Sequence, residues 1–428
     1  MAFEKACRAV AGLGLELRRL SPYFVYLLLE GGLAVLMSMI FTASSIYQVS
    51  VARLTPLQLV LVGTSLELSV LVFEVPTGVV ADVYSRRLSV LIGLFLIGLG
   101  FILEGSIPLF VSILLAQVLW GLGYTFTSGA TQAWITDEIG EAAAGQAFLR
   151  SSQVGQLGSL AGIILGALVG SFAVNLPIIA GGGLIILLGV LLVFTMPETG
   201  FSPLPQQERN SWQNMAHTFR QGVAVARSRP TLLIILGIGL FYGLYSEGFD
   251  RLWTKHMVED IGFPLMGGFQ PVIWVGIMRA GGMLLSVAAV EFVRRRAKTD
   301  NHQSLAQVLM LVTIALIFSL IGFALAPGFV LALLAYWIIY ISRSLIDPLY
   351  TNWINQKLDS RVRATVISMS GQVDAMGQIA SGPLVGMIGN LFSVRTAIGL
   401  TGFILAPILA LFGRVKRQEP ELAPEAVD

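Results

Sequence analysis

Residues 73–87 read Phe-Glu-Val-Pro-Thr-Gly-Val-Val-Ala-Asp-Val-Tyr-Ser-Arg-Arg, and they carry the most informative pattern of the sequence for the type of fold. It starts inside an apolar run at 57–81 and ends where a second apolar run, 88–106, begins. A helix that crosses a membrane needs about 20 apolar residues in succession. Because Lys and Arg gather in cytoplasmic loops, Arg86 and Arg87 predict a short cytoplasmic turn between two membrane-spanning helices.

Similar apolar runs recur along the whole chain. Helices are expected, because a backbone in lipid must satisfy its own hydrogen bonds. The runs are too long and too uniformly apolar for the strands of a membrane β-barrel, which span the bilayer in about ten residues. The sequence predicts twelve spans, at 22–48, 57–81, 88–106, 109–133, 146–171, 176–196, 231–256, 265–293, 305–326, 329–353, 363–389 and 395–413.

Composition agrees with this pattern. The 428 residues are 55% hydrophobic and 12% charged, and the mean hydropathy is +0.79. A soluble globule with so few charges would expose large apolar patches and aggregate. These values exclude a soluble enzyme, a nucleic-acid-binding protein and a disordered chain, and we expect an all-α membrane protein without enzyme activity.

Few residues are suited to bind a metal or cofactor. Cys7 is the single cysteine, so an intramolecular disulfide and a cysteine-based metal cluster are excluded. His217, His256 and His302 lie far apart and suggest no metal site. No nucleotide-binding P-loop is present, which argues against a pump driven by ATP. We predict no metal and no cofactor.

The basic residues predict the orientation and the domains. On this map 21 of the 27 Lys and Arg residues face the cytoplasm, so both termini are expected there, with the protein in the plasma (cell inner) membrane. The predicted parts are an amphipathic arm at 1–20, a six-helix half at 21–196, a linker at 197–229, a second half at 230–413 and a tail at 414–428.

An internal repeat supports the two halves. A shift of 219 residues aligns Trp134 with Trp353 and Gly158 with Gly377, and a shift of 217 aligns Glu30 with Glu247. Copies that lie six spans apart share one orientation, so the sequence predicts two parallel repeats about an axis along the membrane normal.

The turn at residues 78–87 resembles the signature Gly-x-x-x-Asp-x-x-x-Arg-Arg/Lys of the major facilitator superfamily. This resemblance implies a fold of twelve helices in two six-helix halves and transport by alternating access. It also implies that four residues form a conformational latch, namely Gly78, Asp82, Arg86 and Arg87. In this interpretation Gly78 lets a neighbouring helix approach closely; the alternative is a tight turn whose arginines only set the topology.

The lead-in Glu74-x-Pro-Thr-Gly78 resembles the drug:proton antiporter-3 branch, whose members are labelled tetracycline, macrolide or multidrug exporters. Further similar stretches lie at 121–129, 133–138, 196–200 and 242–251. Two features depart from the family pattern: span 5 lacks the Gly-Pro element of antiporters, and span 4 lacks the arginine of its motif. The glycines of span 5, at 155, 158, 162, 166 and 170, are interpreted as close helix packing.

Ionisable residues inside predicted spans are candidates for function, because charge is costly in the membrane. At 1.5 Å per residue, Glu30, Glu67 and Asp374 lie about 12–16 Å into their spans. A carboxyl in a dry cavity favours its neutral form and ionises when water enters, so it can carry a proton. The proposed carriers are Glu30, Glu67, Glu247 and Asp374.

Three further ionisable residues are expected to supply counter-charge or to bind an anionic substrate group: Arg279, Arg343 and Asp347. The alternative for Arg343 and Asp347, four residues apart, is a static ion pair. Glu104, Glu259 and Asp260 are expected to be solvated.

Aromatic residues in the spans are candidates for a substrate cavity that binds flat apolar or cationic compounds. At helical spacing they fit packing or interfacial positions equally well. The candidates are Tyr124, Trp134, Tyr242, Tyr245, Tyr340 and Trp353.

The function that these features favour is proton-coupled export of a small amphipathic organic compound or drug by a secondary transporter, with its site at the midplane between the halves. A lipid or lysolipid flippase and an organic-anion transporter that uses Arg279 and Arg343 remain alternatives on the same fold. A channel or sensor is disfavoured, since no filter-like element is visible. Protons and membrane lipids are the other expected partners, nucleic acid is not, and a monomer is expected.

Overall fold

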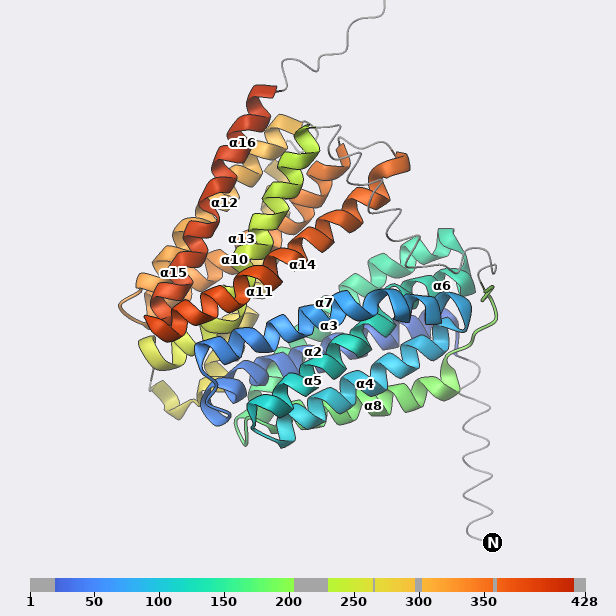
Figure 1. Ribbon diagram of the computed structural model, residues 1–428. Coiled ribbons are helices and arrows are strands. Elements are labelled where there is room, and N and C mark those ends of the chain that lie inside the picture. The colour runs from blue at the N-terminus through green and yellow to red at the C-terminus, as the bar shows by residue number, and fades with distance from the viewer. Residues whose placement is uncertain (1–19, 204–229, 265, 297–301, 357–359, 419–428) are drawn as a thin grey trace, which may run out of the picture. The chain divides into compact units, whose positions relative to one another are not determined.

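The computed structural model describes residues 20–203, 230–264, 266–296, 302–356 and 360–418. Most of the predicted arm, residues 204–229 of the predicted linker and residues 419–428 of the predicted tail therefore lie outside the described residues. The described residues form helices joined by short turns, and no strand occurs among them (Figure 1). The predicted all-α class is confirmed.

Eleven helical segments within these ranges are long and apolar enough to cross a membrane. Helix α14 (Ser360–Leu391) is a further helix of 32 residues, and it covers the predicted span 363–389. It carries many polar residues and holds Asp374 near its middle. The long helices therefore correspond to the twelve predicted runs, because each run needs the same length to cross the hydrocarbon core.

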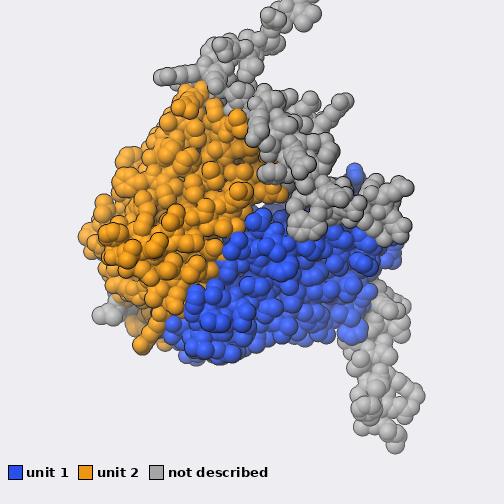
Figure 2. Space-filling view, viewed as in Figure 1, with its two compact units in different colours: residues 1–52, 65–212 blue, residues 53–64, 213–428 orange. Residues whose placement is uncertain are grey.

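The chain divides into two compact units, which Figure 2 colours separately. The described residues of unit 1 lie within 1–52 and 65–212, and those of unit 2 lie within 53–64 and 213–428. One helix is shared, because the first turns of α3 (Pro56–Val83) belong to unit 2 and its remainder to unit 1.

Unit 1 consists of antiparallel helices joined by short turns. Helix α2 starts at Pro22, where Ser21 caps it by accepting a hydrogen bond from the Phe24 amide. Its last turn passes into a π-helical turn, η1 (Tyr47–Val51). The elements are α2 (Pro22–Ile46), η1, the later part of α3, α4 (Arg86–Ser106), α5 (Phe110–Thr127), α6 (Ala130–Ile139), α7 (Glu141–Gly170) and α8 (Leu176–Thr195).

Unit 2 repeats this plan. Besides the start of α3 it contains α10 (Pro230–Lys255), the π-helical turn η3 (His256–Ile261), the 3-10 turn η4 (Met266–Gly268), α11 (Pro271–Arg296), α12 (His302–Leu325), α13 (Phe329–Gln356), α14, α15 (Val394–Ile404) and α16 (Ala406–Gln418).

The main helix pairs of unit 1 have counterparts in unit 2. In unit 1, α2 packs on α7, α4 on α5, and α4 on α8. In unit 2, α10 packs on α14, α12 on α13, and α12 on α15. These are the same pairs when each helix is replaced by the one six spans later, as expected for the predicted repeats.

Glycines bring the first pair of each unit into close contact. A Cβ at Gly162 of α7 would collide with the Val35 carbonyl oxygen of α2. Gly377 of α14, the repeat counterpart of Gly158, sits against α10, where a Cβ would lie 2.6 Å from the Leu240 carbonyl oxygen. Small residues that let backbones approach are typical of membrane helix interfaces, so the packing role predicted for the span-5 glycines is confirmed at Gly162.

Several helix boundaries differ from the predicted spans, and glycines mark two of the differences. The run that begins at 109 breaks at Gly129, whose φ of 74° only glycine adopts readily, and continues as α6. Gly140, with φ 81°, separates α6 from α7, so that α7 begins at Glu141 rather than at residue 146. The residues around Gly129 are apolar or uncharged, so hydropathy alone does not show the first break.

Candidate functional site

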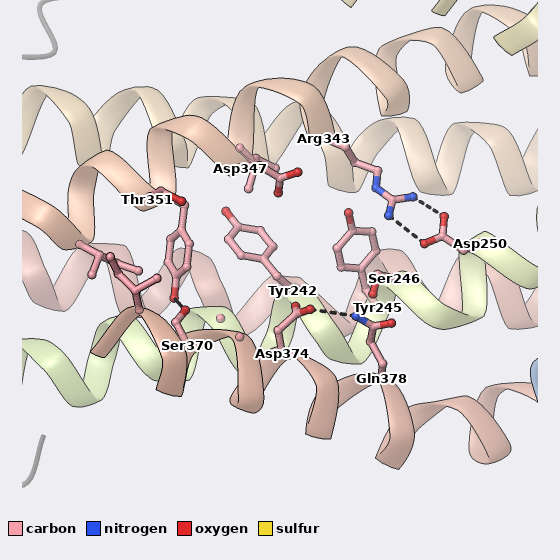
Figure 3. A pocket seen from close by; sticks show the side chains of 16 residues that line it. Tyr242, Tyr245, Ser246, Asp250, Arg343, Asp347, Thr351, Ser370, Asp374 and Gln378 are labelled. Carbon is pink, nitrogen blue, oxygen red and sulfur yellow. Dashed lines mark hydrogen bonds and ion pairs between the residues drawn. The ribbon is translucent and has the colours of Figure 1, made fainter. Parts of the chain in front are cut away.

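A cavity of about 460 Å³ lies within unit 2, between α10, α13 and α14 (Figure 3). Each of these helices contributes polar side chains from its middle turns. The lining residues are Gly239, Tyr242, Tyr245, Ser246, Asp250, Arg343, Ile346, Asp347, Tyr350, Thr351, Ile354, Ile367, Ser370, Gly371, Asp374 and Gln378.

One face of α10 supplies two tyrosines and a carboxylate. Tyr242, Ser246 and Asp250 follow one another at intervals of four residues, and Tyr245 lies beside them, so that all four side chains point to the same side of the helix. The phenol rings are largely buried, at 8% exposure for Tyr242 and 4% for Tyr245. This face of α10 therefore presents two aromatic rings to the cavity, followed by the Asp250 carboxylate.

Arg343 of α13 is held by Asp250 through two parallel hydrogen bonds (Figure 3). The Nη2 atom donates to Oδ2 over 2.8 Å and Nη1 donates to Oδ1. The guanidinium also lies over the Tyr245 ring, 5.9 Å from its centroid. Such a bidentate pair fixes the orientation of both groups.

Two more carboxyls line the cavity. Asp374 of α14 accepts a hydrogen bond of 2.8 Å from the Gln378 side-chain amide, one turn later. Asp347 lies one turn after Arg343 on α13. The expected alternative of a static pair between Asp347 and Arg343 is not what the structure contains, because Arg343 bonds to Asp250 across the helix interface.

Two of the three tyrosine hydroxyls are anchored by residues outside the cavity lining. Tyr242 shares a hydrogen bond of 2.7 Å with Thr313, and Tyr350 donates to the Ile235 carbonyl oxygen over 2.7 Å. The Tyr242 and Tyr350 rings meet edge to face at 5.8 Å. These contacts fix the rings, so their faces and edges form a rigid apolar surface.

The cavity therefore combines three carboxyls, one guanidinium and three tyrosine rings. An excess of carboxyl groups attracts cations, and the rings add cation–π contact. Within the described residues, no group of three or more His, Cys, Asp and Glu side chains is arranged to hold a metal ion. The arrangement can bind an organic cation or protons at its carboxyls.

Five of the predicted site residues meet in this cavity: Tyr242, Tyr245, Arg343, Asp347 and Asp374. The other predicted residues of unit 2 lie outside its lining. Glu247 is 2% exposed and accepts a hydrogen bond of 3.0 Å from Arg251. Trp353 is fully buried, and its ring packs against the Phe412 ring. Arg279 of α11 interacts electrostatically with Tyr336, and Tyr340 of α13 lies against Gly282 of α11.

Four further predicted residues of unit 1 lie on four different helices. Glu30 and Glu67 are half-buried, on α2 and α3 respectively. Tyr124 is 48% exposed. Trp134 is buried and donates to the Pro197 carbonyl oxygen over 2.6 Å, so in this structure it is a packing residue rather than part of a cavity wall.

The turn that joins α3 and α4 is tied to α6 and to the chain after α8. Arg86 forms an ion pair with Asp137 over 2.5 Å. Glu198 accepts hydrogen bonds from the Ser85 hydroxyl over 2.6 Å and from the Arg87 backbone amide over 2.9 Å. A carboxylate at the start of α4 is stabilised by the positive end of the helix dipole.

The structure gives no close packing contact at Gly78 within its own unit. A Cβ placed there would meet no heavy atom of the described residues of unit 1 within 4 Å. The close helix approach expected at Gly78 stays a prediction. The contacts of the turn are made by its arginines and by Glu198.

Several residues of these clusters were not identified in the sequence. Asp250, Gln378 and Glu198 have their partners in other helices or one turn away. For Asp250, the only sequence signal is its spacing from Tyr242, which places both residues on one helix face. No sequence signal relates Glu198 to Arg87.

Known proteins agree with this architecture. The model of the Major Facilitator Superfamily matches residues 22–373. An uncharacterized MFS-type transporter of Bacillus subtilis (strain 168), YxaM, is 23% identical over 365 residues, which cover 82% of this chain and 86% of that protein.

Solved structures show the same fold at low identity. The nucleoside transporter NupG has a TM-score of 0.74 at 15% identity, over 93% of this chain and 100% of that chain. A bacterial homolog of the human lysosomal transporter Spinster has a TM-score of 0.73 at 14% identity, over 92% and 96% of the two chains. A POT family transporter in complex with 5-aminolevulinic acid has a TM-score of 0.72 at 13% identity, over 93% of this chain and 96% of that chain.

Proposed function

Because the chain belongs to the Major Facilitator Superfamily, and is therefore a multi-pass membrane transporter, we propose that it exports a cationic, amphipathic organic compound in exchange for protons. The observation that carries this proposal is the cavity of unit 2, in which three carboxyls and three tyrosine rings surround a single arginine. Transporters of this fold bind their substrates near the membrane midplane.

The charges of the cavity favour a cation over an anion. Arg343 is already bonded to Asp250, so an anionic substrate would have to displace a bidentate partner. A cationic group meets Asp347 and Asp374 as further carboxyls, and its apolar part meets the Tyr242 and Tyr245 rings. This arrangement argues against the organic-anion alternative.

We assign proton carriage to Asp374. Its carboxyl is bonded to the neutral amide of Gln378, which can support either protonation state after a rotation of the amide. A proton and a substrate cation compete for the same carboxyl, and such competition couples their movements in opposite directions. Glu30, Glu67 and Glu247 remain proposed as further proton-binding groups.

The turn cluster at 78–87 is proposed to act as a latch between conformations, through Asp82, Arg86 and Arg87, with Gly78 kept as part of the motif. The Arg86–Asp137 pair and the Glu198 bonds support a role in holding this end of unit 1 together. The proposed location is the cytoplasmic membrane with both termini inside the cell, and the proposed working form is a monomer.

The energetics depend on substrate charge. Exchange of one proton for one monovalent cation moves no net charge, so a pH difference of one unit supports about tenfold accumulation, or about 1.4 kcal/mol. A neutral substrate would also respond to the membrane potential, which is worth about 2.3 kcal/mol per 100 mV. The response to valinomycin therefore distinguishes a cationic from a neutral substrate.

Uptake of ethidium, which carries a permanent charge, into inverted vesicles with an acidic lumen tests the proposal. Active protein accumulates ethidium until nigericin collapses the pH difference. Asp374→Asn reduces this accumulation by tenfold or more but retains downhill exchange, because Asp347 and the tyrosine rings still bind the cation while the exchangeable proton is lost.

Glu291→Gln serves as the matched control, because Glu291 is an exposed carboxyl at the end of α11, bonded to Arg294 and Arg295 and outside the cavity lining. It keeps full accumulation. Unchanged concentrative uptake in Asp374→Asn would contradict the assignment. Headgroup-dependent lipid movement without ethidium-dependent proton flux would favour a flippase instead.

A further inference from the structure

Unit 1 contains a buried carboxyl that the proposed transport cycle does not use. Glu104, near the end of α4, is completely inaccessible to solvent, contrary to the expectation that it is solvated. Side chains from α2, η1 and α5 surround it. Burial of a charged group is costly unless polar partners and opposite charge compensate for it, so this cluster calls for a chemical explanation.

Three neutral groups donate hydrogen bonds to Glu104. The Ser44 hydroxyl and the Gln48 amide donate to Oε1 over 2.5 and 2.9 Å, and the Gln117 amide donates to Oε2 over 3.1 Å. The Gln48 amide also donates to the Ser44 oxygen, so the Ser44 hydrogen is directed to the carboxyl. Donors on both oxygens fit an ionised carboxylate, which only accepts.

Two buried oxygen atoms have no hydrogen-bond partner and belong to residues that interact with this carboxylate. They are Oε1 of Gln117 and the hydroxyl of Tyr47, whose residues are 2% and 1% exposed. Exchange of the Gln117 amide atoms would place its oxygen against the carboxylate, where the two would repel each other. The Tyr47 phenol lies within electrostatic range of Glu104. Unpartnered buried oxygens of this kind are rare in folded proteins.

The backbone at the same place is also unusual. Helix α2 ends at Ile46 and continues as the π-helical turn η1, which supplies both Tyr47 and Gln48. Single π-helical turns occur frequently at functional sites. The carboxyl end of a helix carries partial negative charge, which favours a cation beside it.

From these observations we infer that Glu104, Gln117 and Tyr47 form a binding site for Na⁺. One carboxylate and several neutral oxygens give the charge that suits a monovalent cation. Divalent ions usually take more carboxylate ligands, and the described residues contain no cluster of three or more acidic, His or Cys side chains that could hold one. The ion compensates the Glu104 charge and satisfies both unpartnered oxygens.

The site is independent of the transport proposal, because all its residues belong to unit 1 and the cavity residues belong to unit 2. Its test therefore uses binding and stability rather than transport. A ligand that binds only the folded state raises the unfolding temperature in proportion to the logarithm of its concentration above the dissociation constant.

The experiment measures thermal unfolding of the purified full chain by tryptophan fluorescence, with NaCl replaced stepwise by KCl or choline chloride at constant ionic strength. Na⁺ raises the midpoint in a saturable way, and K⁺ and choline raise it less. Tyr47→Phe removes one ligand oxygen without burying a new charge, and it weakens the apparent Na⁺ affinity by about tenfold or more, as loss of metal-site groups does.

Tyr26→Phe is the matched control, because Tyr26 is a buried tyrosine of the preceding helix α2 with its own contact to Ser151; it keeps the wild-type response to Na⁺. Glu104→Gln abolishes the response, and where this variant fails to fold, Gln117→Leu replaces it. Identical midpoints of the wild type in Na⁺, K⁺ and choline overturn the inference, as does a wild-type Na⁺ response in both Tyr47→Phe and Gln117→Leu.

Discussion

Arg343 and Asp250 show how single residues set the charge of the cavity. Their side chains are 33% and 40% exposed, and two parallel hydrogen bonds join them between α13 and α10. Ion pairs with this exposure contribute at most about 1 kcal/mol. Their importance is that removing the arginine leaves three carboxyls close together without a cation.

Arg343→Gln is therefore expected to lower the unfolding temperature and reduce ethidium export more than the double variant Arg343→Gln, Asp250→Asn, which removes both charges. The coupling between the two positions should be about 1 kcal/mol. Thermal unfolding and vesicle uptake of the two single variants and the double variant provide the measurement. Additive effects of the two substitutions would show that the pair does not act as a unit.

At the scale of helices, the pair α2 and α7 depends on glycine. Gly162 brings the helix backbones so close that a methyl group would collide with the Val35 carbonyl oxygen. Forcing a side chain into a packed interface costs about 1–3 kcal/mol. The close approach also explains why this span tolerates so many residues that weaken an isolated helix.

Gly162→Ala is expected to lower the unfolding temperature of the protein, because α7 must move away from α2. Gly145→Ala, in the same helix, is the control, since a Cβ there meets nothing within 4 Å, and it should leave the midpoint unchanged or raise it slightly through better helix propensity. Equal midpoints for the two variants would contradict the packing assigned to Gly162.

At the scale of the whole molecule, the sequence predicted the helices better than the site. Apolar runs identify spans because lipid imposes length and composition on each helix independently. The break at Gly129 was missed because a single residue with positive φ does not alter hydropathy. The Asp250–Arg343 pair was missed because it joins residues 93 positions apart, and only packing of α10 beside α13 brings them together.

Proton exchange at the cavity of unit 2 is the central claim for the molecule, and substrate-induced proton release tests it most directly. Ethidium is added to purified protein in weakly buffered solution while the pH is recorded. We predict that wild-type protein releases protons on binding, and that Asp374→Asn binds ethidium with little or no release. Binding without proton release in the wild type, or equal release from Asp374→Asn, would contradict the account.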